Sequence, residues 1–91
     1  MDERKRMIKK IQQTCDFCPS QWEISLSDGR MVYVRYRWGY LSFRISPNPT
    51  KDILDAVDGR EIMGDQIGDG LSGELSQEDM MPYLQSALQW I

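Results

Sequence analysis

The sequence predicts an α+β fold: an antiparallel meander sheet of three to four strands, packed by a C-terminal helix, with a further helix at the N-terminus. Residues 20–46 alternate apolar and polar side chains in three runs that turn signals separate, which is typical of a meander. Residues 79–91 repeat apolar side chains at helical spacing. Because domains generally contain about 100–200 residues, we expect residues 1–91 to form one small domain.

The first hairpin of the meander is expected to turn through three residues. A two-residue loop at Asp28-Gly29 would divide the apolar side chains between both faces of the sheet. A loop of Ser27 to Gly29, with Gly29 in the left-handed region as a bulge, keeps them on one face. The register that follows pairs Ile24 with Val32 and Trp22 with Val34.

The second hairpin is expected to turn through two residues, Trp38 and Gly39. This loop pairs Tyr36 with Leu41 and keeps every apolar residue of the meander on one face. It also places a tryptophan where the turn requires a positive φ, which favours glycine or asparagine, so a longer loop is an alternative.

These registers give the sheet two different faces. The apolar face and the C-terminal helix are expected to form the core, from Trp22, Ile24, Leu26, Val32, Val34, Tyr36, Leu41, Phe43, Ile45, Leu84 and Leu88. The opposite face, called here the polar face, presents arginines interleaved with tyrosines: Tyr33, Arg35, Arg37, Tyr40 and Arg44.

Residues 1–14 are expected to form a helix or an arm. Met7, Ile8 and Ile11 would share one side of a helix, with basic residues elsewhere. This apolar stripe is narrow, so we expect the helix to lie at the edge of the core, and it is one candidate to cover the polar face.

After the meander, the sequence predicts a short helix over 50–58, a weak strand over 60–67 and the C-terminal helix over 79–91. Thr50 is the expected cap of the short helix. Since proline is best tolerated in the first turn of a helix, Pro82 places the N-cap of the C-terminal helix at Asp79.

The composition excludes several kinds of chemistry. The chain contains no histidine, which removes Ser-His-Asp and Cys-His nucleophile pairs and every imidazole base. No motif places a carboxylate beside a nucleophile, so we expect neither enzymatic activity nor a cofactor. We also expect a cytoplasmic protein without a membrane partner. No run approaches the ~18 apolar residues of a membrane span, and residues 1–13 lack the apolar segment of a signal peptide.

Cys15 and Cys18 form a C-x-x-C motif, which supplies two thiolates to a metal. Four-coordinate zinc needs two further ligands, and the chain contains no other cysteine. The motif is therefore at most half of a metal site, to be completed in a dimer or by a partner. Ordinary reduced thiols are the simpler expectation, so no metal site is predicted.

The distribution of charge and aromatic residues suggests a binding surface. Residues 30–46 contain four arginines and no acid, although the net charge of the chain is −3. Tyrosine, tryptophan and arginine are enriched at protein-binding hot spots. We therefore predict a small, non-enzymatic protein-interaction module that binds through the polar face, with single-stranded nucleic acid as the alternative ligand. A homodimer is a further expectation, because so small a core is marginal, and these features are typical of bacterial or phage accessory proteins.

Overall fold

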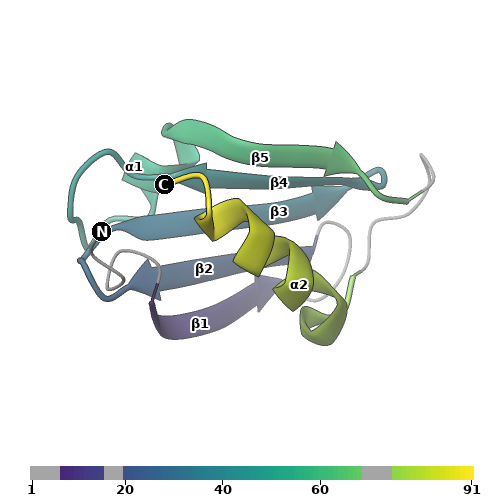
Figure 1. Cartoon of the computed structure of the whole chain (residues 1–91), viewed down its shortest axis with the longest axis horizontal. Helices are drawn as coiled ribbons and strands as arrows, with labels where there is room; N and C mark the ends of the chain where they lie inside the picture. Colours follow the sequence, from purple (N-terminus) through teal and green to yellow (C-terminus); the bar gives the residue numbers. More distant parts are fainter. Residues whose placement is uncertain (1–6, 16–19, 69–74) are drawn as a thin grey trace.

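The computed structural model describes residues 7–15, 20–68 and 75–91. Within these residues five antiparallel strands form one sheet in the chain order β1-β2-β3-β4-β5 (Figure 1). This arrangement confirms an α+β meander with a C-terminal helix, and it has more strands than the three to four predicted. The elements are β1 (Ile8–Cys15), β2 (Ser20–Leu26), β3 (Met31–Arg37), β4 (Tyr40–Ile45), α1 (Leu54–Val57), β5 (Arg60–Gln66) and α2 (Gln77–Leu88).

The predicted N-terminal helix is wrong in the described part of that segment, where β1 extends the sheet along the outer edge of β2. The register of this pair shifts between Ile8 and Lys10, so that Ile8 lies opposite Leu26 and Ile11 opposite Ile24. This β-bulge places two isoleucines three positions apart on the same face. A spacing of three is also what a helix produces, which is why the sequence pattern indicated a helix.

Both predicted hairpin registers are confirmed. In the first, Ile24 pairs with Val32, and Gly29 has a φ of +94°. In the second, Val34 pairs with Phe43 across a two-residue turn at Trp38 and Gly39. These two residues have φ angles of +55° and +77°. The tryptophan therefore adopts a backbone conformation that is uncommon for a bulky residue.

The core lies between the sheet and α2, which crosses one face (Figure 1). Every residue predicted for the core is buried. Met80 and Ala87 of α2, which belong to the apolar repeat of that helix, are also buried there. The Ser20 hydroxyl accepts a hydrogen bond from the Leu75 backbone N–H over 3.1 Å and so ties β2 to the segment that leads into α2.

Helix α2 begins earlier than predicted. Ser76, not Asp79, is the N-cap, and its hydroxyl accepts a hydrogen bond from the Asp79 backbone N–H over 3.1 Å. Asp79 lies in the first turn beside Glu78. Negatively charged side chains at this position stabilise a helix, because they interact favourably with the positive end of its dipole. Pro82 therefore lies inside the helix rather than in its first turn. No helix in the described residues is long and apolar enough to cross a membrane.

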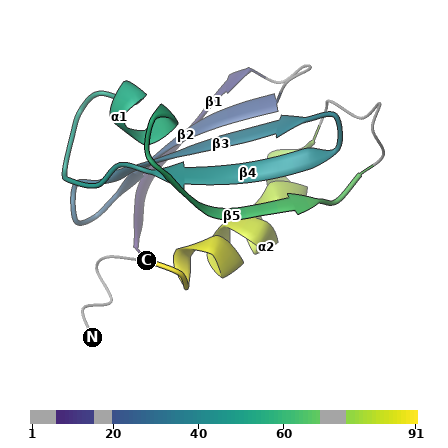
Figure 2. The same ribbon diagram turned by 90° about the horizontal axis from the view of Figure 1, so that it is seen from above.

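Helix α1 is shorter than the predicted helix over 50–58, and Thr50 does not cap it. Instead, the Asp52 carboxylate accepts from the Leu54 backbone N–H over 3.0 Å, and the Thr50 hydroxyl donates to the Asp55 carboxylate over 2.6 Å. Figure 2 shows α1 and α2 on opposite sides of the sheet. Helix α1 packs against β3 and β4, and so covers one end of the face opposite the core.

Candidate interaction surface

The polar face predicted from the sequence exists on β3 and β4. Along both strands buried residues alternate with more exposed ones, and the exposed set contains all five predicted residues. Arg37 and Tyr40 are exposed, whereas Tyr33, Arg35 and Arg44 are half-buried. The polar face therefore divides into a more open end at the β3–β4 turn and a more covered end near α1.

Arg44 belongs to the covered end. Its guanidinium donates a hydrogen bond to the Gly59 carbonyl oxygen over 3.1 Å, which joins β4 to the turn after α1. On the neighbouring strand Tyr33 lies opposite Arg44 in the sheet. Burial raises the pKa of the Tyr33 hydroxyl, while Arg35 lowers it and Glu23 raises it. Because its hydrogen bond to Gly59 holds the turn after α1 against β4, Arg44 has a structural role.

Arg35 lies between the two ends, and no recorded ion pair fixes it in the described part of the chain. Its neighbours across the sheet, Gln21 and Ser42, are uncharged. The Nε atom is buried and has no hydrogen-bond partner among the described residues. Unpaired buried polar groups are uncommon in native structures, because each costs about 1–3 kcal/mol. Arg35 thus places a positive charge on the polar face without an ion pair among the described residues, and Glu23 is its diagonal neighbour on the same face.

Tyr40 stands at the open end and covers a glycine of β5. Its hydroxyl donates to a Glu61 carboxylate oxygen over 3.1 Å. A Cβ added at Gly64 would collide with this hydroxyl, so the tyrosine occupies the space that the glycine leaves. The pKa of Tyr40 is raised by burial first, and then by its hydrogen bond to Glu61 and the negative charges of Glu61 and Asp65. Even so, 40% of the residue is exposed.

Trp38 completes the open end, and it was not among the predicted site residues. It is 50% exposed, and the Arg37 guanidinium carbon lies 5.3 Å from the centroid of its ring. This is the geometry of a cation–π contact. The available signal was the Trp-Gly dipeptide itself, since an exposed turn that requires a positive φ normally contains asparagine, aspartate or glycine.

The end of β5 holds the Trp38 turn in place. The Gln66 side-chain amide donates to the Trp38 carbonyl oxygen over 2.9 Å. The backbone N–H groups of Ile67 and Gly68 both donate to the Gly39 carbonyl oxygen, over 2.9 and 3.1 Å. A strained backbone persists only where its surroundings fix it, and these three bonds do so here. The open end is therefore a firmly held arrangement of Arg37, Trp38 and Tyr40.

The comparisons do not extend this description. Protein-family models, curated proteins and solved structures gave no match to the chain. Among the described residues no group of three or more cysteine, aspartate or glutamate side chains is placed to hold a metal ion. Cys18 and the side chain of Cys15 lie outside the described residues, and with them both the expected reduced thiols and the half-site considered as the alternative.

Proposed function

We propose that the protein is a non-enzymatic interaction module that binds an acidic segment of a partner protein. Its contact surface is the open end of the polar face, formed by Arg37, Trp38 and Tyr40, together with the adjacent Arg35. Of the five residues predicted from the sequence, Tyr33 and Arg44 move from the contact surface to its support, because they pair with each other at the covered end and Arg44 is bonded to Gly59.

The conformation of Trp38 is the observation that most strongly supports this proposal. A non-glycine residue with positive φ costs about 1–3 kcal/mol and persists most often at functional sites. Burial of the apolar sheet face explains the two-residue turn, but burial of the Trp38 side chain does not explain why a tryptophan occupies it, because half of the residue is exposed. A tryptophan that is strained, exposed and firmly held has the properties of an anchor for a binding partner.

The charges around this surface favour an acidic protein over a nucleic acid. Arg35 and Arg37 supply positive charge that no recorded ion pair neutralises in the described residues, which suits a carboxylate on a partner. Glu61 and Asp65 both act on Tyr40, the other aromatic residue of the surface. They would repel the phosphates of a strand whose bases stacked on Tyr40. Discrete carboxylates on a folded or extended protein segment can avoid them.

Charge reversal at Arg37 tests the proposal. We expect a protein to copurify with the tagged wild-type chain from an extract of the cells that produce it. Arg37→Glu should reduce that capture at least tenfold, because it removes both the positive charge and the cation–π contact. The yield is measured by quantitative mass spectrometry at matched bait concentration. Arg37 is exposed, so the variant should unfold at the wild-type denaturant concentration.

Lys10→Glu is the matched control, since it makes the same change of charge at an exposed position on β1. It should capture the partner as well as the wild type does. Equal losses for both variants would mean that only net charge matters and would contradict the proposal, as would full capture by Arg37→Glu. If the captured material is RNA or single-stranded DNA that nuclease removes, the nucleic-acid alternative replaces the proposal.

A further inference from the structure

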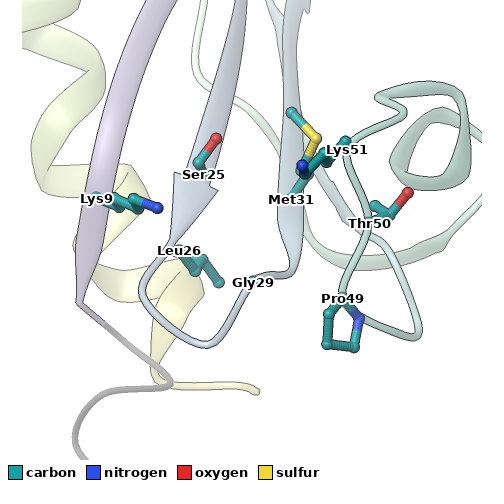
Figure 3. A pocket seen from close by; sticks show the side chains of 8 residues that line it. All are labelled: Lys9, Ser25, Leu26, Gly29, Met31, Pro49, Thr50 and Lys51. Carbon is teal, nitrogen blue, oxygen red and sulfur yellow. The ribbon is translucent and has the colours of Figure 1, made fainter.

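A second candidate site lies at the opposite end of the sheet from Trp38, beside the β2–β3 turn. It is an open pocket of ≈ 620 Å³ between β1, β2, β3 and the loop that follows β4 (Figure 3). Its lining contains two lysines and no acid: Lys9, Ser25, Leu26, Gly29, Met31, Pro49, Thr50 and Lys51. A pocket of this size accommodates a small organic molecule.

The wall formed by the loop is fixed to the sheet. The Thr50 backbone N–H donates to the Gly29 carbonyl oxygen over 3.0 Å. Ser46 adds a second tie, because its hydroxyl accepts from the Met31 backbone N–H and donates to the Asn48 carbonyl oxygen, both over 3.0 Å. The pocket is therefore formed before any ligand binds, which lowers the entropic cost of binding.

The two lysines reach the pocket from separate elements. Lys9 lies between the residues at which the register of β1 shifts, and a bulge of this kind redirects side chains. Lys51 comes from the loop after β4. Figure 3 shows Lys9 and Lys51 on opposite sides of the pocket, with Ser25 between them. Neither lysine has a recorded ion pair within the described part of the chain.

The acids closest in sequence to Lys51 accept hydrogen bonds from their own segment, and no ion pair joins them to Lys51 within the described residues. Asp52 accepts from the Leu54 backbone N–H, and Asp55 accepts from the Thr50 hydroxyl, at distances of 3.0 and 2.6 Å. The pocket combines two ammonium groups that have no ion pair among the described residues, and the Ser25 hydroxyl, with apolar surface from Met31 and Pro49. Lysine ammonium groups bind phosphate as compact point charges.

We propose that this pocket binds a small organic phosphate. The phosphate group lies between the ammonium groups of Lys9 and Lys51, and the organic part lies against Met31 and Pro49. The site is independent of the protein-binding surface at Trp38, which lies at the other end of β3.

Titration with phenyl phosphate, followed by ¹H–¹⁵N NMR of the full chain, tests this assignment. We expect saturable shifts of the Ser25, Leu26 and Gly29 amides and none at Gly39. Phenyl phosphate should bind more tightly than inorganic phosphate, which lacks an apolar part, and more tightly than phenol, which lacks the charge. No saturable shift, or equal affinity for either simpler probe, would overturn the proposal.

Substitution of Lys9 and Lys51 tests where the phosphate group binds. Lys9→Gln and Lys51→Gln should each weaken phenyl phosphate binding about fivefold, as expected for an exposed ion pair. Lys10→Gln is the matched control, because Lys10 is adjacent in β1 but does not line the pocket, and it should bind within twofold of the wild type. Wild-type affinity in Lys9→Gln or Lys51→Gln, or an equal loss in Lys10→Gln, would contradict the assignment. Arg37→Glu should bind phenyl phosphate normally, which separates this test from that of the protein-binding surface.

Discussion

Phe43→Ala is expected to lower the free energy of unfolding by about 3–5 kcal/mol. Phe43 is completely buried at the centre of β4, where it pairs with Val34 on one side and Met63 on the other. Removing the ring loses the free energy gained by burying it away from water, and it leaves a cavity in the core between the sheet and α2. A domain of this length has a total stability of roughly 5–14 kcal/mol, so the variant should be close to unfolding. Urea denaturation followed by tryptophan fluorescence measures the change.

The neighbouring substitution Ser42→Ala is the matched control. Ser42 lies on the same strand, but its side chain is on the polar face, so the free energy of unfolding should change by less than about 0.5 kcal/mol. A shift of one residue in the register of β4 would exchange the faces of these two residues. Equal effects of the two substitutions, or a larger effect of Ser42→Ala, would show that the two faces are assigned wrongly. If Phe43→Ala does not fold, Phe43→Leu provides a milder version of the same comparison.

Gly59→Ala is expected to destabilise the protein by about 3 kcal/mol, at the upper end of the usual range for overpacking. Gly59 occupies the turn between α1 and β5, and a Cβ there would collide with the Ile45 carbonyl oxygen. The Ala56 carbonyl oxygen would lie only 3.1 Å away. Both obstacles are backbone atoms, so β4 or α1 would have to move. The denaturation midpoint, compared with that of the wild type, measures the cost.

Gly64→Ala separates this effect from a general intolerance of alanine at glycine positions. A Cβ at Gly64 would meet the Tyr40 hydroxyl, which is the far end of a side chain that can rotate away. The substitution loses the Tyr40–Glu61 hydrogen bond but gains the better strand propensity of alanine. We expect a change of less than about 1 kcal/mol. A cost at Gly64 as large as that at Gly59 would contradict the backbone explanation.

The middle of the fold was predictable because its apolar pattern permits only one arrangement. Placing Trp22, Ile24 and Val32 on one face determines the loop length of the first hairpin without further information. The same constraint predicted the two-residue turn at Trp38, although local preference opposed it. Burial of a whole face therefore outweighed the conformational preference of one residue.

The ends of the fold were less predictable, because there the local pattern is ambiguous. In β1 a bulge gave Ile8 and Ile11 the spacing of a helix. At α2 the expectation that Pro82 lies in the first turn placed the start of the helix too late. For β1 the deciding information is a tertiary contact, the edge of β2, whereas the start of α2 is set locally by the Ser76 cap.

The candidate surface was predicted in part. Alternation along β3 and β4 correctly placed all five predicted residues on one face. It could not show that α1 and its turn cover the end with Arg44, because a short helix gives no sequence signal for the face on which it packs. The prediction also omitted Trp38, since alternation assigns faces only to strand residues and Trp38 lies in the turn.

The comparison of Trp38→Asn with the wild type is the most direct test of the central claim, that a strained tryptophan is held for binding. Asparagine adopts positive φ readily before glycine in a hairpin turn. We expect the variant to be more stable by about 1 kcal/mol, part of the strain that tryptophan imposes, and to capture the partner at least tenfold less well. A variant that loses stability, or that captures the partner as well as the wild type, would contradict the account.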